Sequence, residues 1–310
     1  MTERELSEQT RPRALPRVLA VLAVGSLLAA VATVAWALGV LPGGSRGTTV
    51  LVMGSDSREG DNAAHAPGDD DSERADSIVL VHLAEDGGAT VVSLPRDTVV
   101  ERPECEGTDG GSVHGSDEEP LNQAFAIGGA ECAVAAVERT TGVPVDHHAV
   151  LDFVAMSELS TLVGGVEVTV PEGIEPGFAN GLEPGRQVLA GDDAVAFLRL
   201  RHVGEDQSDL RRIERQQEFL RGLVAAAGQG GLLSDPARAV ELASEFTERI
   251  ETDPGLANPM TLGRLLNEHR GIAGADVEIL TAPVVDSEVN PLAWVEFSPD
   301  AKRLWRRLGA

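Results

Sequence analysis

The sequence is poor in lysine and in positive charge overall, and this excludes one large class of function. Lys302 is the only lysine against 24 Arg, and the formal net charge of the 310 residues is −25. Residues 1–46 hold five Arg and three Glu, a balance of +2, so residues 47–310 carry −27. Because nucleic acid is itself a polyanion, and because no helix-turn-helix pattern or basic DNA-reading segment is visible, it is a poor partner for this chain.

Cysteine is almost as scarce, since Cys105 and Cys132 are the full complement. No C-x-x-C or Cys/His spacing is present, which argues against a structural zinc site. In an oxidising compartment an even pair predicts one disulfide, which would close a loop of roughly 28 residues and add about 3 kcal/mol of stability. Two separate free thiols are the alternative.

One long apolar run stands apart from the rest of the chain. Val18–Leu41 holds 24 residues without a charge, and a helix of that length is roughly 36 Å long, enough to cross a bilayer. Arginines precede it, which places residues 1–17 in the cytoplasm and the chain after Leu41 outside. A cleavable signal peptide is the alternative, because Ala35-Trp36-Ala37 resembles a cleavage site. The run is longer than the apolar part of a signal peptide, so we predict an uncleaved, single-pass anchor.

After a linker over 42–47, the chain predicts one extracytoplasmic domain over 48–310, without internal repeats or a second domain. Alternating strands and helices indicate an α/β domain with a mixed sheet. A loop is expected over 102–120. The expected strands are 49–53, 77–83, 90–94, 146–151, 166–170, 277–282 and 293–297. The expected helices are 131–140, 153–162, 209–220, 236–250, 260–269 and 299–308.

Charged residues flank the two strands that the acidic-glycine turn Glu85–Gly88 joins. Arg74 and Asp76 precede the first strand, and Arg96 and Asp97 follow the second. Because a hairpin brings its outer ends together, these four side chains should meet at one edge of a sheet.

A third strand, Thr49–Met53, leads directly to Asp56 and Arg58, which would join the cluster if this strand pairs with the hairpin. Two carboxylates can share a hard cation such as Mg²⁺, and arginine forks bind phosphate oxygens. Exposed salt bridges at strand ends are the alternative.

Two later segments add arginines. Arg199 and Arg201 end the run GDDAVAFLRLR, and Arg212 and Arg215 lie three apart, on one face of a predicted helix. A solvated helix face is the alternative interpretation. In an otherwise acidic chain, four arginines in neighbouring segments favour an anion site.

An ordered set of motifs resembles the LytR-CpsA-Psr family of cell-wall glycopolymer transferases, in its actinobacterial type. The blocks are GSDSR (54–58), RADS (74–77), SLPRD (93–97), LNQAF (121–125) with Gly128-Gly129, TGVPVDHHAVLDF (141–153), GDDAVAFLRLR (191–201) and DLRRIERQQ (209–217).

The resemblance implies a three-layer α-β-α domain around a mixed central sheet, preceded by one transmembrane helix. It also implies a Mg²⁺-dependent (or Mn²⁺-dependent) phosphotransferase that moves a glycopolymer phosphate from a polyprenyl pyrophosphate carrier to peptidoglycan, outside the cell membrane. A pyrophosphatase that releases the glycan phosphate to water is the first alternative. A membrane-anchored regulator without enzymatic activity is the second.

Residue roles follow from the resemblance, position by position. Asp56 and Asp76 would bind the metal, and Asp97 would support Arg96 or position a ligand. The residues implied at the pyrophosphate are Arg58, Arg74, Arg96, Asn122, Arg199, Arg201, Arg212 and Arg215. Together with Arg74 and Arg96, the three aspartates form the implied catalytic set. Possible linings of a tunnel for the lipid are Phe125, Phe153, Leu159 and Leu162, which would look the same as ordinary core residues.

Overall fold

The structure is a computed structural model, and the part of the chain that it describes excludes the N-terminal segment and several later stretches. The described residues are 47–55, 75–174, 181–200, 215, 218–223, 225–226, 250–258, 261, 265 and 277–310, without the side chain of Asp76. The predicted anchor over 18–41, most of the predicted helix over 209–220 and almost all of the predicted helices over 236–250 and 260–269 lie outside these residues. No described helix combines the length and the apolar character that crossing a membrane requires.

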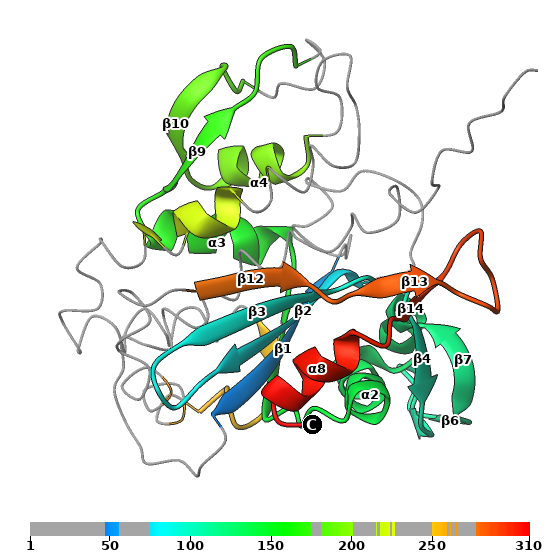
Figure 1. The fold of residues 1–310 in the computed structure, drawn as a ribbon. Coiled ribbons are helices and arrows are strands. Elements are labelled where there is room, and N and C mark those ends of the chain that lie inside the picture. Colours follow the sequence, from blue (N-terminus) through cyan, green and yellow to red (C-terminus); the bar gives the residue numbers. More distant parts are fainter. Residues whose placement is uncertain are drawn as a thin grey trace, which may run out of the picture.

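A six-stranded mixed sheet forms the centre of the domain, in the order β11-β8-β1-β2-β3-β12 (Figure 1). The pairs β1·β2, β2·β3 and β8·β11 are antiparallel, whereas β1·β8 and β3·β12 are parallel. The strands are β1 (Thr48–Ser55), β2 (Ala75–Leu83), β3 (Ala89–Leu94), β8 (His147–Leu151), β11 (Glu251–Thr252) and β12 (Val277–Thr281). The predicted hairpin and its pairing with the first strand are therefore confirmed.

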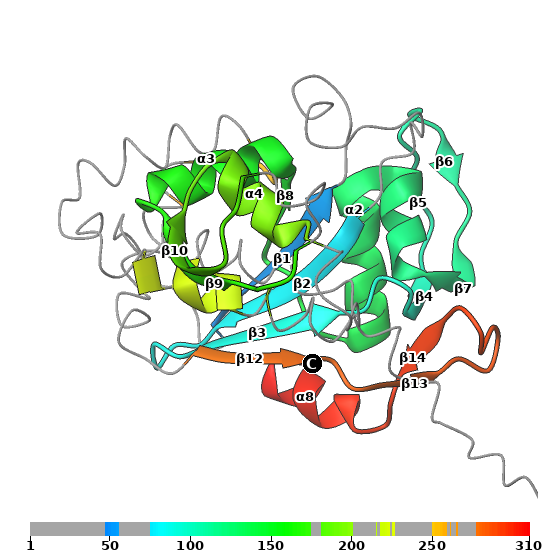
Figure 2. The ribbon, with the colours of Figure 1, turned by 90° about the horizontal axis from the view of Figure 1, so that it is seen from above.

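Both faces of this sheet are covered, which explains why its strands are continuously apolar. Val50 and Val52 of β1 face one core cluster, and Leu51 and Met53 face the other. The first cluster lies under α3 (Phe153–Leu162), α4 (Asp192–Leu198), β9 (Val166–Val170) and β10 (Gly185–Leu189). The second lies under α2 (Leu121–Thr141) and α8 (Ala301–Arg307). Figures 1 and 2 show the two groups on opposite faces, and the mixed sheet with helices on both sides is confirmed.

The segment predicted as a loop over 102–120 is instead built from short strands, and that prediction was wrong. The strands are β4 (Val99–Arg102), β5 (Cys105–Glu106), β6 (Ser112–Val113) and β7 (Ser116–Pro120). β4 pairs with β7, and β5 pairs with β6. The sequence here is polar and glycine-rich, so it shows no alternation of apolar residues from which a strand could be predicted.

Helix α2 begins ten residues earlier than the predicted helix over 131–140. The structure shows two helical pieces joined at Gly128 and Gly129, whose backbones are not helical; Gly129 has a φ of 64°. Only glycine adopts such a backbone without strain. Because the glycine pair interrupts the helical pattern, the first piece, which carries Asn122, was not predicted from the sequence.

The C-terminal part adds a small hairpin and the last helix. β13 (Val284–Asp286) pairs with β14 (Val295–Phe297), and α8 follows directly. β13 was not predicted. β14 is two residues shorter and α8 three residues shorter than predicted, because the ends of such elements fray into turns. Elements that carry clear end signals agree with the prediction. For example, α3 begins after Asp152, whose side chain accepts a hydrogen bond from Ala155 N at 2.8 Å.

Candidate functional site

The motif residues gather at one edge of the central sheet, because the strand directions place their ends there. β1, β3 and β8 end at this edge, and the antiparallel β2 begins at it. Gly54 pairs with Ser77, but Ser55 pairs with Ala75, so Asp76 is the extra residue of a β-bulge. Such bulges redirect a side chain and are common beside active sites. Asp76 therefore lies next to the point where β1 leaves the sheet towards Asp56.

The turn from Pro95 to Thr98 follows β3 at this edge and forms the base of the site. Thr98 N donates to Pro95 O at 3.0 Å, which closes the turn. The first two amide groups of α2 then donate to the turn, Leu121 N to Thr98 O and Asn122 N to Arg96 O, each at 2.9 Å. The first amides of a helix have no partner within the helix. Here these contacts satisfy two of them and fix the start of α2 against the turn.

Three predicted site residues meet on this turn. Arg96 Nε lies 3.7 Å from Asp97 Oδ2, and Asn122 Nδ2 donates to Asp97 Oδ1 at 3.4 Å. The side chains of Arg96 and Asp97 are 36% and 30% exposed. A carboxylate that contacts both a guanidinium and an amide fixes the relative positions of two donor groups, and the Arg96 side chain is partly exposed to solvent. The arrangement can therefore bind an anion with multiple oxygens, such as a phosphate.

Arg199 lies near the same edge, at the end of β8. Its Cζ is 5.0 Å from the centroid of the Phe153 ring, a cation–π contact. Phe153 begins α3 directly after β8, and the side chain of Arg199 is exposed. β8 and β3 are separated by β1 and β2, so their ends are about 14 Å apart at ordinary strand spacing. Arg199 and Arg96 thus lie at the same edge of the sheet, Arg199 on the β8 side of the site and Arg96 on the β3 side.

Arg215 has a different environment. Its side chain is buried, and its Nη2 donates to Leu200 O at 2.7 Å. This bond holds the helical segment around 218–223 against the chain that follows α4. A role of Arg215 at a pyrophosphate stays a prediction. The predicted ligands Asp56, Arg58, Arg74, Arg201 and Arg212 lie outside the described residues, as does the side chain of Asp76.

A family model matches most of the sequence. Residues 42–308 match the LytR_cpsA_psr family. The chain belongs to the LytR-CpsA-Psr family. The actinobacterial resemblance is also confirmed, because the chain is 31% identical over 263 residues to "Cell wall biosynthesis protein LcpA" of Corynebacterium glutamicum, covering 76% of this chain and 50% of that protein.

Two further similarities bear on fold and relatives. The chain is 25% identical to "Polyisoprenyl-teichoic acid--peptidoglycan teichoic acid transferase TagV" of Bacillus subtilis, covering 74% of this chain and 57% of TagV. Its fold is similar to that of the solved "LytR-Csp2A-Psr enzyme from Actinomyces oris", with a TM-score of 0.61, 24% identity, and coverage of 88% and 93% of the two chains. The chain spans about half the length of the curated relatives it matches.

A magnesium site in this LytR-CpsA-Psr domain would depend on two residues at the start of β2 and the end of β1. Among the residues that the structure describes, no group of three or more His, Cys, Asp or Glu side chains could hold a metal ion. The backbone nevertheless places Asp76 in the bulge opposite Ser55, the neighbour of Asp56. Carboxylate oxygens are the ligands that Mg²⁺ prefers, so the residue types at this position fit the metal.

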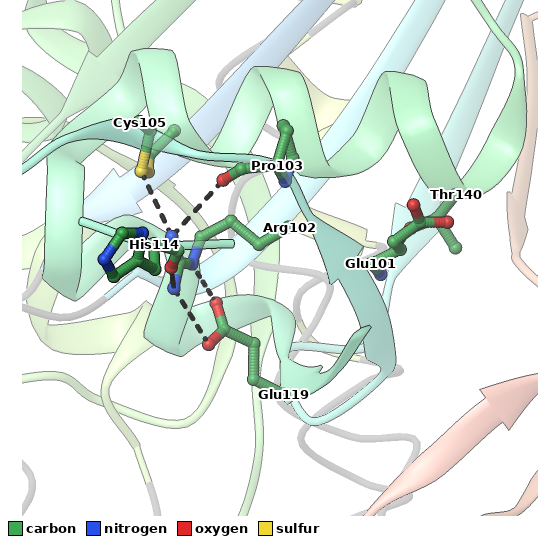
Figure 3. Close-up of polar contacts among 8 residues, drawn as sticks. Glu101, Arg102, Pro103, Cys105, His114, Glu119 and Thr140 are labelled. Atoms are coloured by element: carbon green, nitrogen blue, oxygen red, sulfur yellow. Dashed lines mark hydrogen bonds and ion pairs between the residues drawn. A yellow bond between two sulfur atoms is a disulfide. The ribbon is translucent and has the colours of Figure 1, made fainter. Parts of the chain in front are cut away.

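Behind the site, a buried network holds the β4–β7 segment together, and sequence reasoning missed most of it. Arg102 pairs with Glu119, and its Nη1 and Nη2 donate to Pro103 O at 3.3 Å and His114 O at 2.9 Å (Figure 3). The predicted disulfide between Cys105 and Cys132 is present, with a Cα–Cα distance of 5.7 Å. It attaches β5 to the second piece of α2, three residues after the glycine kink, so it holds the part of the helix that follows the kink.

The residues considered for a lipid tunnel do not share one location. Phe125 is buried in the cluster under α2, whereas Leu159 is buried in the cluster on the other face of the sheet. Because both side chains are buried, both are core residues. Phe153 and Leu162 are partly buried against the cluster that contains Leu159. The Phe153 ring also makes the cation–π contact with Arg199. The sequence did not predict this contact.

Proposed function

We propose that this protein transfers a glycopolymer phosphate from a polyprenyl pyrophosphate carrier to peptidoglycan, with Mg²⁺ (or Mn²⁺) as the metal. The observation that carries the proposal is the turn from Pro95 to Thr98, where Arg96, Asp97 and Asn122 meet at the sheet edge beside the Asp76 bulge. The names of LcpA and TagV support a cell-wall substrate, since one is a cell wall biosynthesis protein and the other a teichoic acid transferase.

Binding of the pyrophosphate would use the two sides of the edge. Arg96 is oriented by Asp97, and Asn122 is held by the same carboxylate, so both donors are preorganised before the substrate arrives. Arg199 is held by the Phe153 ring on the β8 side. Phosphoryl transfer requires mostly positioning and neutralisation of charge, and such preorganised donors supply both.

The reaction would break one bond of the pyrophosphate and form one new ester. A hydroxyl oxygen of peptidoglycan attacks the phosphorus that carries the glycan, the bond to the bridging oxygen breaks, and polyprenyl phosphate leaves. The proton of the hydroxyl passes to a carboxylate of the site. Asp56 and Asp76 would hold Mg²⁺, which would neutralise charge on the pyrophosphate oxygens. The described arginines and Asn122 would position the phosphate that is transferred.

The site would face the outside of the cell membrane, with the chain anchored by residues 18–41. The apolar run and the arginines before it support this location. A lipid-linked donor lies at the membrane surface, so the anchor would keep the enzyme on the same surface as its substrate.

The direct test uses the full chain in detergent with a short polyprenyl pyrophosphate-linked sugar and Mg²⁺, with and without a peptidoglycan acceptor. Wild type is compared with Asp76→Ala and Arg96→Ala. Arg139→Ala is a matched control, because Arg139 is 62% exposed in a surface pair with Glu101. We expect sugar phosphate on the acceptor with wild type and the control, loss with both site variants, and loss of all transfer when the metal is chelated.

Two outcomes would contradict the proposal. Release of the sugar phosphate to water alone, even when the acceptor is present, would identify a pyrophosphatase with the same site. Tight binding of the lipid without turnover, unchanged by either site substitution, would instead indicate a regulator or binding module.

A further inference from the structure

The hairpin of β13 and β14 carries a cluster of exposed apolar side chains. Val285, Val289 and Leu292 are 50%, 46% and 80% exposed. Among the described residues, the only other exposed large hydrophobic side chain is Val188, far along the chain on β10. Single exposed apolar residues are ordinary, but a cluster on one projecting loop is typical of a contact surface. In both views the loop between β13 and β14 projects away from the body of the domain (Figures 1 and 2).

Internal hydrogen bonds give this loop a fixed shape. Ser287 N donates to Trp294 O at 3.0 Å, and Trp294 N donates to Asn290 O at 2.8 Å. The Ser287 hydroxyl and Glu288 N both donate to the Glu296 carboxylate, at 2.6 and 2.9 Å. A preformed loop pays little ordering entropy when it binds. The apolar side chains are therefore held outwards by the loop itself.

The base of the hairpin is hydrogen-bonded to the turn from Pro95 to Thr98. Val295 N donates to Asp97 O at 3.1 Å, and Thr98 and Val295 form an isolated parallel bridge. The position of the hairpin tip and the position of Arg96 and Asp97 are thus rigidly linked. Whatever the tip contacts will set the distance between that partner and the site.

The charge of the hairpin determines the chemistry of its partner. Between Arg270 and Lys302 the chain has no lysine or arginine, whereas Asp286, Glu288 and Glu296 are acidic. A polyanion is therefore excluded as the partner of the tip, and anionic headgroups would repel it. The exposed side chains of the hairpin match an apolar phase, and the lipid-linked donor of the proposed function brings one to the site.

We propose that the loop between β13 and β14, which carries Val289 and Leu292 next to the exposed Val285 of β13, inserts into the outer boundary of the bilayer and holds the catalytic edge at the membrane surface. This inference rests on the proposed function. The direction of β1 explains why an anchor alone is insufficient. Thr48 begins β1 at the opposite edge of the sheet, and its eight residues span about 26 Å. The linker over 42–47 reaches about 20 Å when extended. Anchored only there, the domain is able to turn its catalytic edge away from the membrane.

Trp294 provides a reporter inside the hairpin. The chain contains Trp36, Trp294 and Trp305, and Trp305, which belongs to α8, is buried. We would reconstitute the full-length Trp36→Phe protein into zwitterionic vesicles that contain brominated phospholipids. We expect quenching of the Trp294 emission, and loss of that quenching in the variant Val289→Ser/Leu292→Ser. Val188→Ser is the matched control, because it removes an exposed valine elsewhere and should leave the quenching unchanged.

Activity separates this inference from the proposed function. The hairpin variant should keep wild-type transfer from a short-chain donor in detergent, and lose transfer from a long-chain donor embedded in vesicles. Anionic lipid should weaken the quenching, and added salt should restore it, because the contact is apolar and the domain is acidic. If neither wild type nor any variant turns over a donor, the proposed function is wrong, but the quenching experiment still tests the contact between the hairpin and the membrane.

Three results would overturn the membrane contact. The first is unquenched Trp294 emission in the Trp36→Phe protein. The second is an equal loss of transfer from both donors in the hairpin variant, which would give the loop a role in the site itself. The third is a smaller sedimenting mass of the hairpin variant than of wild type in detergent, which would show that the tip joins two copies of the chain.

Discussion

Two arginine–carboxylate pairs lie at the two ends of β4, with the same chemistry and opposite environments. Arg96 and Asp97 are 36% and 30% exposed and lie 3.7 Å apart at the sheet edge. Arg102 and Glu119 are 3% and 9% exposed, and Arg102 also donates to two carbonyl groups. A buried pair costs desolvation and fixes a local structure, whereas a half-exposed pair keeps its charge accessible to a ligand. The comparison indicates that Arg102 maintains the fold, whereas Arg96 stays accessible to a ligand, as the proposed function requires.

The largest effect is expected when the buried pair is broken. Arg102→Met leaves Glu119 charged and unpaired in the interior, and should lower the free energy of unfolding by about 3–5 kcal/mol. Urea unfolding followed by circular dichroism measures this. Arg139→Met, which breaks the exposed pair with Glu101, should change stability by less than about 1 kcal/mol.

Replacement of both Arg102 and Glu119 tests whether the unpaired charge causes the loss of stability. Arg102→Met/Glu119→Leu should recover most of the lost stability, because no unpaired charge remains. Transfer per folded molecule should be near wild type. A large loss of kcat with full stability would contradict the structural role that we give to Arg102.

The exposed pair should show the reverse pattern. Arg96→Ala should lower kcat/KM for transfer by about 100- to 1,000-fold, the usual cost of removing one preorganised donor to a developing charge. Its unfolding free energy should change by less than about 1 kcal/mol. A variant that unfolds at much lower urea concentration, with unchanged kcat/KM, would reverse the assignment of the two arginines.

A third pair, at the opposite edge of the sheet, extends the comparison to pH. Burial disfavours the Asp253 carboxylate, but hydrogen bonds from His147, His148 N and Leu256 N outweigh it and lower its pKa to about 2. A carboxyl whose folded pKa is lowered contributes stability above its unfolded pKa, and loses it as pH falls through the folded pKa.

Stability should therefore fall by about 1 kcal/mol from this group between about pH 4 and pH 2, after allowance for screening by solvent. The difference in unfolding free energy between wild type and Asp253→Asn, measured across this range, should shrink as pH falls. A difference that stays constant with pH would show that the carboxylate charge contributes nothing.

The smallest effect concerns the arginine on the other side of the site. Phe153→Leu removes the ring under Arg199 and should raise KM for the donor by about two- to fivefold, the equivalent of about 0.5–1 kcal/mol. kcat should stay near wild type. Phe125→Leu is the contrast, because Phe125 is buried in the core and its truncation should lower stability instead. Donor kinetics and urea unfolding separate the two.

Local sequence determined much of the architecture. The strands of the hairpin, α3 and β9 follow from apolar patterns with clear ends, such as the Asp152 cap and the glycines after Leu162. Strand order then brings Asp97 and Asp76 to one edge, so the location of the site also follows from local elements.

The tertiary structure alone decided which charged residues are buried in support of the fold and which stay exposed. Arg96, Arg102 and Arg215 look alike in sequence, yet two of them are buried and one is half-exposed. The short strands over 99–120 are also set by contacts between residues apart in the chain, because the Arg102–Glu119 pair and the Cys105–Cys132 disulfide hold a segment that has no apolar alternation of its own. Burial and pairing depend on residues far along the chain, and a local pattern carries no information about them.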